Sequence, residues 1–149
     1  MLRRFSETEE IVSFSKLREA HMSYYFSKNI YMDFEEAILK VTDELKKEGF
    51  GILTEIDVTA TLKKKLDVDF RNYRILGACN PPFAYKALQV EPNIGVMLPC
   101  NVILQELEDG KIEVAAVDPL ASMQAIQNEE LQSVAEEIQL KLKKVIDQL

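Results

Sequence analysis

The spacing of apolar residues predicts two long helices, each with one buried face. The first begins after Asp33, which can cap a helix N-terminus, and ends near Gly49. The second begins near Asn128, and its acidic start and lysine-rich end suit the helix dipole. In both segments apolar side chains recur three or four positions apart, which places them on one helical face. These positions are Phe34, Ala37, Ile38, Val41 and Leu45 in the first helix, and Leu131, Val134, Ala135, Ile138, Leu142, Val145, Ile146 and Leu149 in the second.

Five other segments have the composition or the alternation of β-strands. Residues 51–58 alternate, so Ile52, Thr54, Ile56 and Val58 are expected on one face of a strand and Leu53, Glu55 and Asp57 on the other. Asp109-Gly110 is a strong hairpin signal and should join the last two strands. The five predicted strands are residues 22–31, 51–58, 73–79, 94–107 and 111–117.

Two shorter helices are expected between the strands. Thr59 can cap a helix with the sequence ATLKKKL. Asn80 followed by Pro81 favours a helix start, because asparagine caps helices and proline fits the first helical position.

An N-terminal arm precedes the predicted domain. Ser6 and Glu9 have the spacing of a capping box, which suggests a short helix from Glu7 to Leu17. Residues 1–21 are therefore expected to be an arm, for which this spacing suggests a helix. No repeat or linker interrupts residues 22–149, which are expected to form a single domain.

The element order predicts an α+β fold. Two long amphipathic helices can cover one face of a mostly antiparallel sheet of about five strands, which gives a two-layer sandwich. The second face of such a sheet has no helical cover. In many proteins of this layout dimerisation buries that face, so a homodimer is expected.

Composition excludes several classes of function. The chain has 149 residues and a formal net charge of −7, which disfavours a nucleic-acid partner because such binding needs clustered Lys and Arg. No apolar run approaches the roughly 20 residues of a membrane helix, and the first residues lack the pattern of an export signal. With only two cysteines and no sign of secretion, a cytoplasmic protein with reduced thiols is expected.

The two cysteines are the sharpest chemical feature, since each precedes an asparagine and adjoins proline. They occur in Cys79-Asn80-Pro81-Pro82 and in Pro99-Cys100-Asn101. If the strands at 73–79 and 94–107 are joined by a parallel crossover, the two thiols become neighbours. Neighbouring thiols can form a redox pair or bind a soft metal. The alternative is that both are small buried hydrophobic residues, because their strand positions share an apolar face.

A second candidate site is the polar edge of the 51–58 strand. Glu55 and Asp57 could act in acid–base chemistry or bind a cation, with Lys63, Arg71 and Arg74 near in sequence. The alternative is an ordinary solvated strand face. The one histidine, His21, lies at the margin of the domain, and no glycine-rich phosphate loop is present. No cofactor is therefore expected.

Three ordered motifs resemble the prokaryotic family called domain of unknown function 302. They are TEIDV at 54–58, YRILGACNPP at 73–82 and LPCNV at 98–102, and the resemblance extends from Met22 to the C-terminus. It implies a compact α+β fold shaped like the TATA-box-binding-protein class and a tendency to form homodimers, without implying DNA binding. The first 21 residues depart from the family pattern. The positions that match its motifs are Glu55, Asp57, Lys63, Arg74, Cys79, Asn80, Pro81, Pro82, Pro99, Cys100 and Asn101.

These observations lead to one principal function hypothesis and two alternatives. The principal hypothesis is a homodimeric, non-enzymatic binding or interaction domain with an unknown small-molecule ligand, and with no nucleic-acid or membrane partner. The first alternative is a thiol-dependent redox or soft-metal-binding protein that uses Cys79 and Cys100. The second is a small enzyme that uses Glu55 and Asp57.

Overall fold

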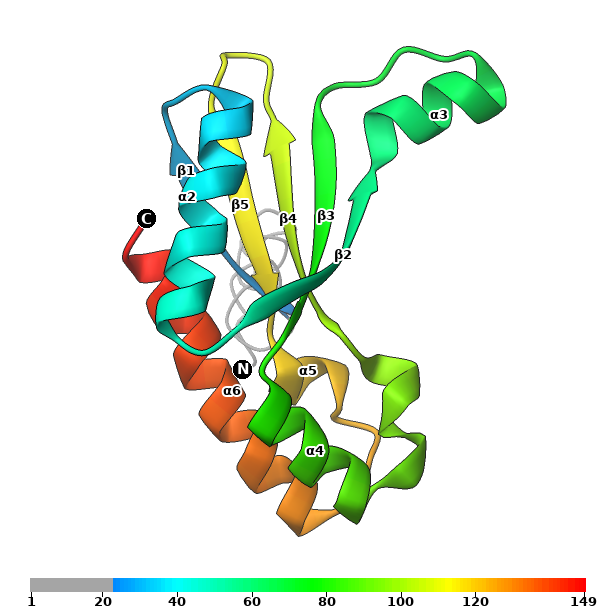
Figure 1. Cartoon of the computed structure of the whole chain (residues 1–149), viewed down its shortest axis with the longest axis vertical. Helices are drawn as coiled ribbons and strands as arrows, with labels where there is room; N and C mark the ends of the chain where they lie inside the picture. Colours follow the sequence, from blue (N-terminus) through cyan, green and yellow to red (C-terminus); the bar gives the residue numbers. More distant parts are fainter. Residues whose placement is uncertain (1–22) are drawn as a thin grey trace, which may run out of the picture.

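A computed structural model describes residues 23–149. Its five strands form one sheet in the order β1-β5-β4-β3-β2, and every neighbouring pair is antiparallel (Figure 1). This confirms the predicted α+β class with a five-stranded sheet. The strands are β1 Tyr25–Ile30, β2 Gly51–Asp57, β3 Tyr73–Cys79, β4 Cys100–Glu106 and β5 Ile112–Val117.

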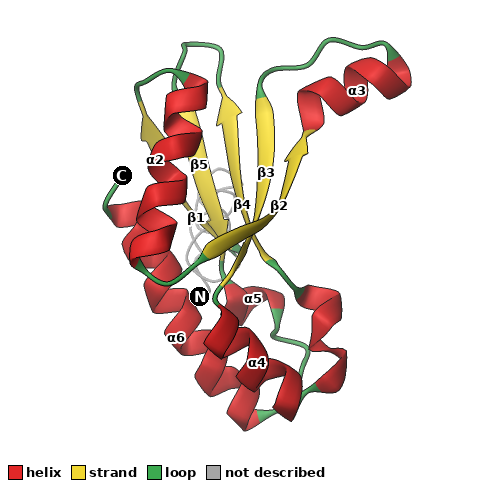
Figure 2. Cartoon of the chain, viewed as in Figure 1, coloured by secondary structure: helices red, strands yellow, loops and turns green. Residues whose placement is uncertain are grey.

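Except for α3, the helices lie in two groups around the sheet. The long helices α2 and α6 pack along one face, whereas α4, α5 and the 3₁₀-helix η1 lie beyond one end of the strands (Figure 2). Helix α3 projects from the end of β2 and has no buried residue. The helices are α2 Phe34–Lys47, α3 Val58–Leu66, α4 Pro81–Val90, η1 Pro92–Met97, α5 Pro119–Ser122 and α6 Glu129–Asp147.

The main core lies between the sheet and the two long helices. Alternate residues of the central strands point into it, including Val102 and Leu104 of β4, and meet Val41 of α2 and Leu142 of α6. Both predicted N-caps are present. The Asp33 carboxylate accepts hydrogen bonds from two backbone amides of α2, and the Asn128 side chain does the same for α6.

The predicted strand at 94–107 is wrong in its first half. Residues 92–97 form η1 instead, and β4 begins only at Cys100. Pro92 and Pro99 cannot donate ladder hydrogen bonds, and Ile94 is buried in a second apolar cluster with Ala87 and Leu131.

The expected parallel crossover between the third and fourth strands is also wrong. Because α4 and η1 lie beyond the end of the sheet and do not cross its face, the chain returns antiparallel to β3.

Thr59 does not cap α3. Asp57 is the N-cap, and its carboxylate accepts a hydrogen bond from the amide of Ala60. The Thr59 hydroxyl instead donates to the carbonyl of Arg71 and accepts from the amide of Tyr73, which ties α3 to the start of β3.

An irregularity in β2 changes the predicted alternation. Ile52 pairs with Ala78 and Thr54 pairs with Gly77, so Leu53 is an extra residue in the manner of a β-bulge. As a result, Ile52 packs against the main core, whereas Thr54 and Ile56 lie on the opposite face.

The second face of the sheet carries no helix from the described residues. A row of apolar side chains crosses it through paired positions of four strands: Ile56, Ile75, Ile103 and Ala115. The arm helix expected over Glu7–Leu17 lies outside the described residues. Within residues 23–149, no helix is long and apolar enough to cross a membrane.

Gly77 should tolerate no side chain, although it occupies the middle of a strand. A Cβ at this position would lie 2.1 Å from the Thr54 hydroxyl and 2.7 Å from a ring carbon of Pro99. We expect Gly77→Ala to lower the free energy of unfolding by about 1–3 kcal/mol, the usual cost of overpacking. The matched control is Gly95→Ala, because a Cβ there meets no atom within 4 Å. Urea unfolding of both variants checks this, and equal midpoints would contradict it.

Candidate functional site

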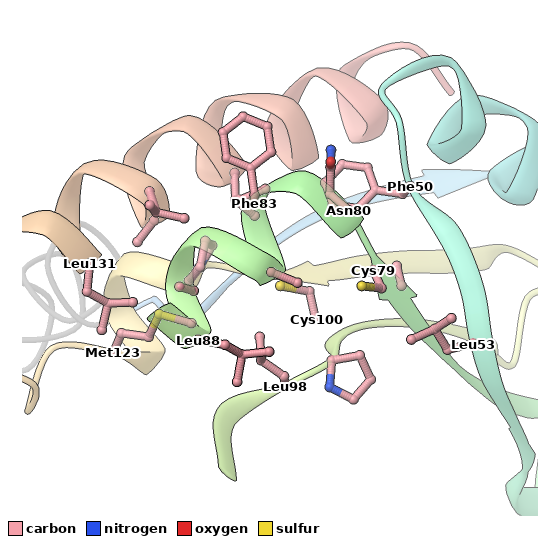
Figure 3. A pocket seen from close by; sticks show the side chains of 18 residues that line it. Phe50, Leu53, Cys79, Asn80, Phe83, Leu88, Leu98, Cys100, Met123 and Leu131 are labelled. Atoms are coloured by element: carbon pink, nitrogen blue, oxygen red, sulfur yellow. The ribbon is translucent and has the colours of Figure 1, made fainter. Parts of the chain in front are cut away.

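A pocket of about 310 Å³ lies where the end of the sheet meets α4 and α6 (Figure 3). Its wall combines the end of β3, the start of β4, one side of α4 and one side of α6. Ala84 and Ala87 keep the α4 wall small, and Phe50 closes the side next to β2. The pocket therefore exists because helices pack against the sheet end with small side chains between them.

The wall is almost entirely apolar. No Asp, Glu, Lys, Arg or His side chain lines it, and its polar groups are the thiols of Cys79 and Cys100 and the amide of Asn80. An ionised group inside such a wall would lose its hydration without gaining a partner of opposite charge. The interior is therefore suited to an uncharged molecule or an uncharged part of one.

Both cysteine side chains line this pocket (Figure 3). Cys79 ends β3 and Cys100 begins β4, and Cys100 pairs directly with Ala78, the residue before Cys79. The antiparallel register, and not the expected parallel crossover, thus brings them to one place. Both cysteines are free.

Burial keeps both thiols protonated near neutral pH. It raises the pKa of Cys100 to about 11, with a smaller contribution from neighbouring Cys79, and it also raises the pKa of Cys79 above its ordinary value. Cys100 is only 9% exposed, whereas Cys79 is half-buried. Since the thiolate is the nucleophile and the metal ligand, this environment lowers the reactivity of both groups.

Asn80 has a structural role at the edge of the pocket. Its buried side-chain amide donates a hydrogen bond of 3.0 Å to the carbonyl of Glu48, at the end of α2. This bond links the start of α4 to the end of α2. Asn80 occupies the N-cap position of α4, as predicted, but makes no side-chain capping bond.

Most of the other residues of the cysteine motifs face elsewhere. Pro81 and Pro82 form the exposed first turn of α4 and do not line the pocket. Asn101 is exposed and pairs with Gly77 on the face of the sheet that α2 and α6 leave uncovered. Pro99 does line the pocket.

The Glu55 and Asp57 carboxylates belong to a separate ion-pair cluster around Arg74. Its guanidinium lies 2.6 Å from Glu55, 2.9 Å from Glu35 on α2 and 3.6 Å from Asp57. Asp57 also caps α3. These contacts give both carboxylates a structural role, and neither carboxylate lines the thiol pocket.

Lys63 does not line the thiol pocket and forms no ion pair with the Arg74 cluster, but it lines a polar groove together with Asp57 and Arg74. Its ammonium pairs with Asp67 at 3.1 Å and with Asp69 at 3.3 Å, within the exposed segment formed by α3 and the loop that follows. Among residues 23–149, no cluster of three or more His, Cys, Asp or Glu side chains could hold a metal ion.

Most of the pocket wall is not evident from the sequence. Leu88, Leu98 and Met123 contribute to it, and in sequence they look like ordinary core residues. The available signal was Leu53, a large apolar residue on the side of its strand that also carries Glu55 and Asp57. It is 67% exposed and borders the pocket from the bulge in β2.

Comparison with known proteins gives a family but no activity. The family model described as domain of unknown function DUF302 matches residues 26–149. The chain is similar to an uncharacterised conserved DUF302 protein from Bacillus stearothermophilus, known from a crystal structure, with 26% sequence identity and a TM-score of 0.77. The match covers 83% of this chain and 96% of that one. No curated protein matches. The fold, the three motifs and the family match together show that this chain belongs to the DUF302 family.

Proposed function

We propose that this protein is a binding domain that holds a small apolar molecule in the pocket between the sheet end, α4 and α6. The observation that carries the proposal is a space of about 310 Å³ with no ionisable side chain in its wall other than two protonated thiols. Ligand pockets in proteins are typically apolar clefts with a few polar groups, and they begin at about this volume.

The volume sets the size of the ligand. A cavity of about 150 Å³ holds a benzene molecule. A space of about 310 Å³ therefore suits a ligand of roughly twice that size, on the order of ten to twelve non-hydrogen atoms. Each buried CH₂ group contributes about 0.8 kcal/mol to binding, so such a ligand has enough apolar surface for micromolar affinity.

Binding without catalysis fits the chemistry of the wall. General acid–base catalysis needs a carboxylate, imidazole or amine within hydrogen-bond reach of the substrate. The wall supplies none of these, and the Glu55–Asp57 pair is bound to Arg74 in another part of the fold.

A thiol-dependent redox or soft-metal function is the second candidate, because Cys79 and Cys100 line the same pocket from adjacent strands. Against it, burial raises the pKa of both thiols. A cytoplasmic location, which would keep both thiols reduced, is part of either proposal.

The homodimer expected from the sequence is the other half of the proposal. Its support is the apolar row across the uncovered sheet face, in which Ile56 is 48% exposed and pairs with Ile75, which in turn pairs with Ile103. Two copies packed through this row would remove these side chains from water.

Filling the pocket should weaken binding. We expect Ala84→Phe, which points a ring into the cavity from α4, to weaken binding of the neutral fluorophore 1-aminonaphthalene by at least about tenfold, the affinity carried by roughly two buried CH₂ groups. The control is Tyr85→Phe, the next residue, which is 66% exposed and outside the pocket wall. Fluorescence titration measures both affinities, and circular dichroism checks folding. Equal binding by wild type and Ala84→Phe would disprove the site.

Interrupting the apolar row should dissociate the dimer. We expect the wild type to have twice the mass of one chain by light scattering, and Ile103→Lys to have the mass of one chain, because a buried unpaired ammonium is costly. Ile56→Lys tests the same face at a more exposed position. Leu140→Lys, on an exposed position of α6, is the control and should stay dimeric. A wild-type monomer at high concentration would refute this part.

The two thiols should react slowly and separately in the folded protein. We expect a colorimetric disulfide reagent to modify Cys79 slowly and Cys100 only after unfolding, with rates that rise as the pH is raised toward 9 and above, where thiolate forms. Cys79→Ala and Cys100→Ala assign each phase. Fast reaction of both native thiols, with joint protection by Cu(I), would instead favour the redox or soft-metal function.

A further inference from the structure

Two lysines flank an aromatic ring that forms part of the pocket wall. Phe83 lines the pocket from α4, and the Nζ atoms of Lys86 and Lys141 lie 5.4 and 5.8 Å from its ring centroid. Lys86 is on α4 and Lys141 is on α6, so two elements each place one ammonium group near this ring.

These lysines differ from two lysines of the long helices that form ion pairs. Lys144 of α6 pairs with Glu48 at 2.9 Å, and Lys47 of α2 pairs with Glu44 at 2.8 Å. Within the part of the chain that the structure describes, neither Lys86 nor Lys141 has a carboxylate within 4.0 Å. Both ammonium groups lie beside a ring that forms part of the uncharged cavity wall.

The helix geometry connects the cavity to the cations. Val134 and Ile138 of α6 line the pocket, and Lys141 follows Ile138 by three residues on the same side of the helix. On α4, Lys86 follows Phe83 by the same interval. On both helices, an apolar residue of the pocket wall is therefore followed three residues later by a lysine that lies near the Phe83 ring.

We propose that the ligand of this pocket is an anionic amphiphile: a hydrocarbon body of about ten carbons with one terminal carboxylate. This inference rests on the proposed apolar binding function. The wall has no charged group that could accept the carboxylate, so the tail fills the cavity and the head lies outside it, between Lys86 and Lys141. A medium-chain fatty acid has this chemistry.

A pair of ligands that differ only in the head group tests the inference. Decanoate and 1-decanol, both below their aggregation concentrations at neutral pH, displace bound 1-aminonaphthalene in a fluorescence assay. We expect wild type to bind decanoate at least about fivefold more tightly than decanol, the upper range for one exposed ion pair. The double variant Lys86→Gln/Lys141→Gln should lose this preference and keep its affinity for decanol. The control Lys64→Gln/Lys65→Gln changes the net charge equally on α3 and should keep the preference.

The outcomes separate this inference from the proposed function. Equal affinity of wild type for decanoate and decanol, or an unchanged preference in the Lys86/Lys141 variant, overturns the anionic ligand and leaves the apolar site in place. If neither compound binds, and Ala84→Phe leaves the affinity for 1-aminonaphthalene unchanged, both proposals fail. A preference that shrinks in 1 M salt in wild type, and is absent from the double variant, supports the lysine pair as the cause.

Discussion

The antiparallel pairing of β3 with β4 is the contact on which the rest of this structure depends. It occupies the middle of the sheet, and its register places Ala78 opposite Cys100. The segment between the two strands contains α4 and η1, which must lie beyond the sheet end for the chain to return in this direction. A parallel crossover would have placed a helix on a face of the sheet and left no pocket at its end.

Gly77 makes this pairing compatible with the neighbouring strand. Thr54 on β2 and Pro99, just before β4, both approach the position where a Cβ would be. This close approach packs β2 and the residue before β4 against β3. The packing positions the end of β3 and the start of β4, which line the pocket. The thiols lie in the pocket wall because Cys79 ends β3 and Cys100 begins β4. Their burial therefore follows from the topology and needs no redox role to explain it.

Local sequence signals predicted the elements well and their arrangement only in part. Asp33 and Asn128 carry capping information in their own side chains, so both long helices could be predicted from short segments. The strand predicted over 94–107 is wrong in its first half because Ile94, Val96 and Leu98 alternate as in a strand, although the prolines on either side interrupt the ladder. The pocket itself could not be read from sequence. Its wall is assembled from distant segments, and its hollow shape depends on how α4 lies relative to α6.

The extra residue at Leu53 reverses which alternate side chains of β2 face the core. Before it, β2 presents Ile52 to the core with Ala78, and after it the odd-numbered positions Glu55 and Asp57 take that side, opposite Leu76 and Arg74. A single insertion therefore divides the strand into two halves with opposite phase. One half contributes to the hollow at the sheet end and the other anchors the ion pairs near α2, so we expect substitutions in the two halves to act on different regions.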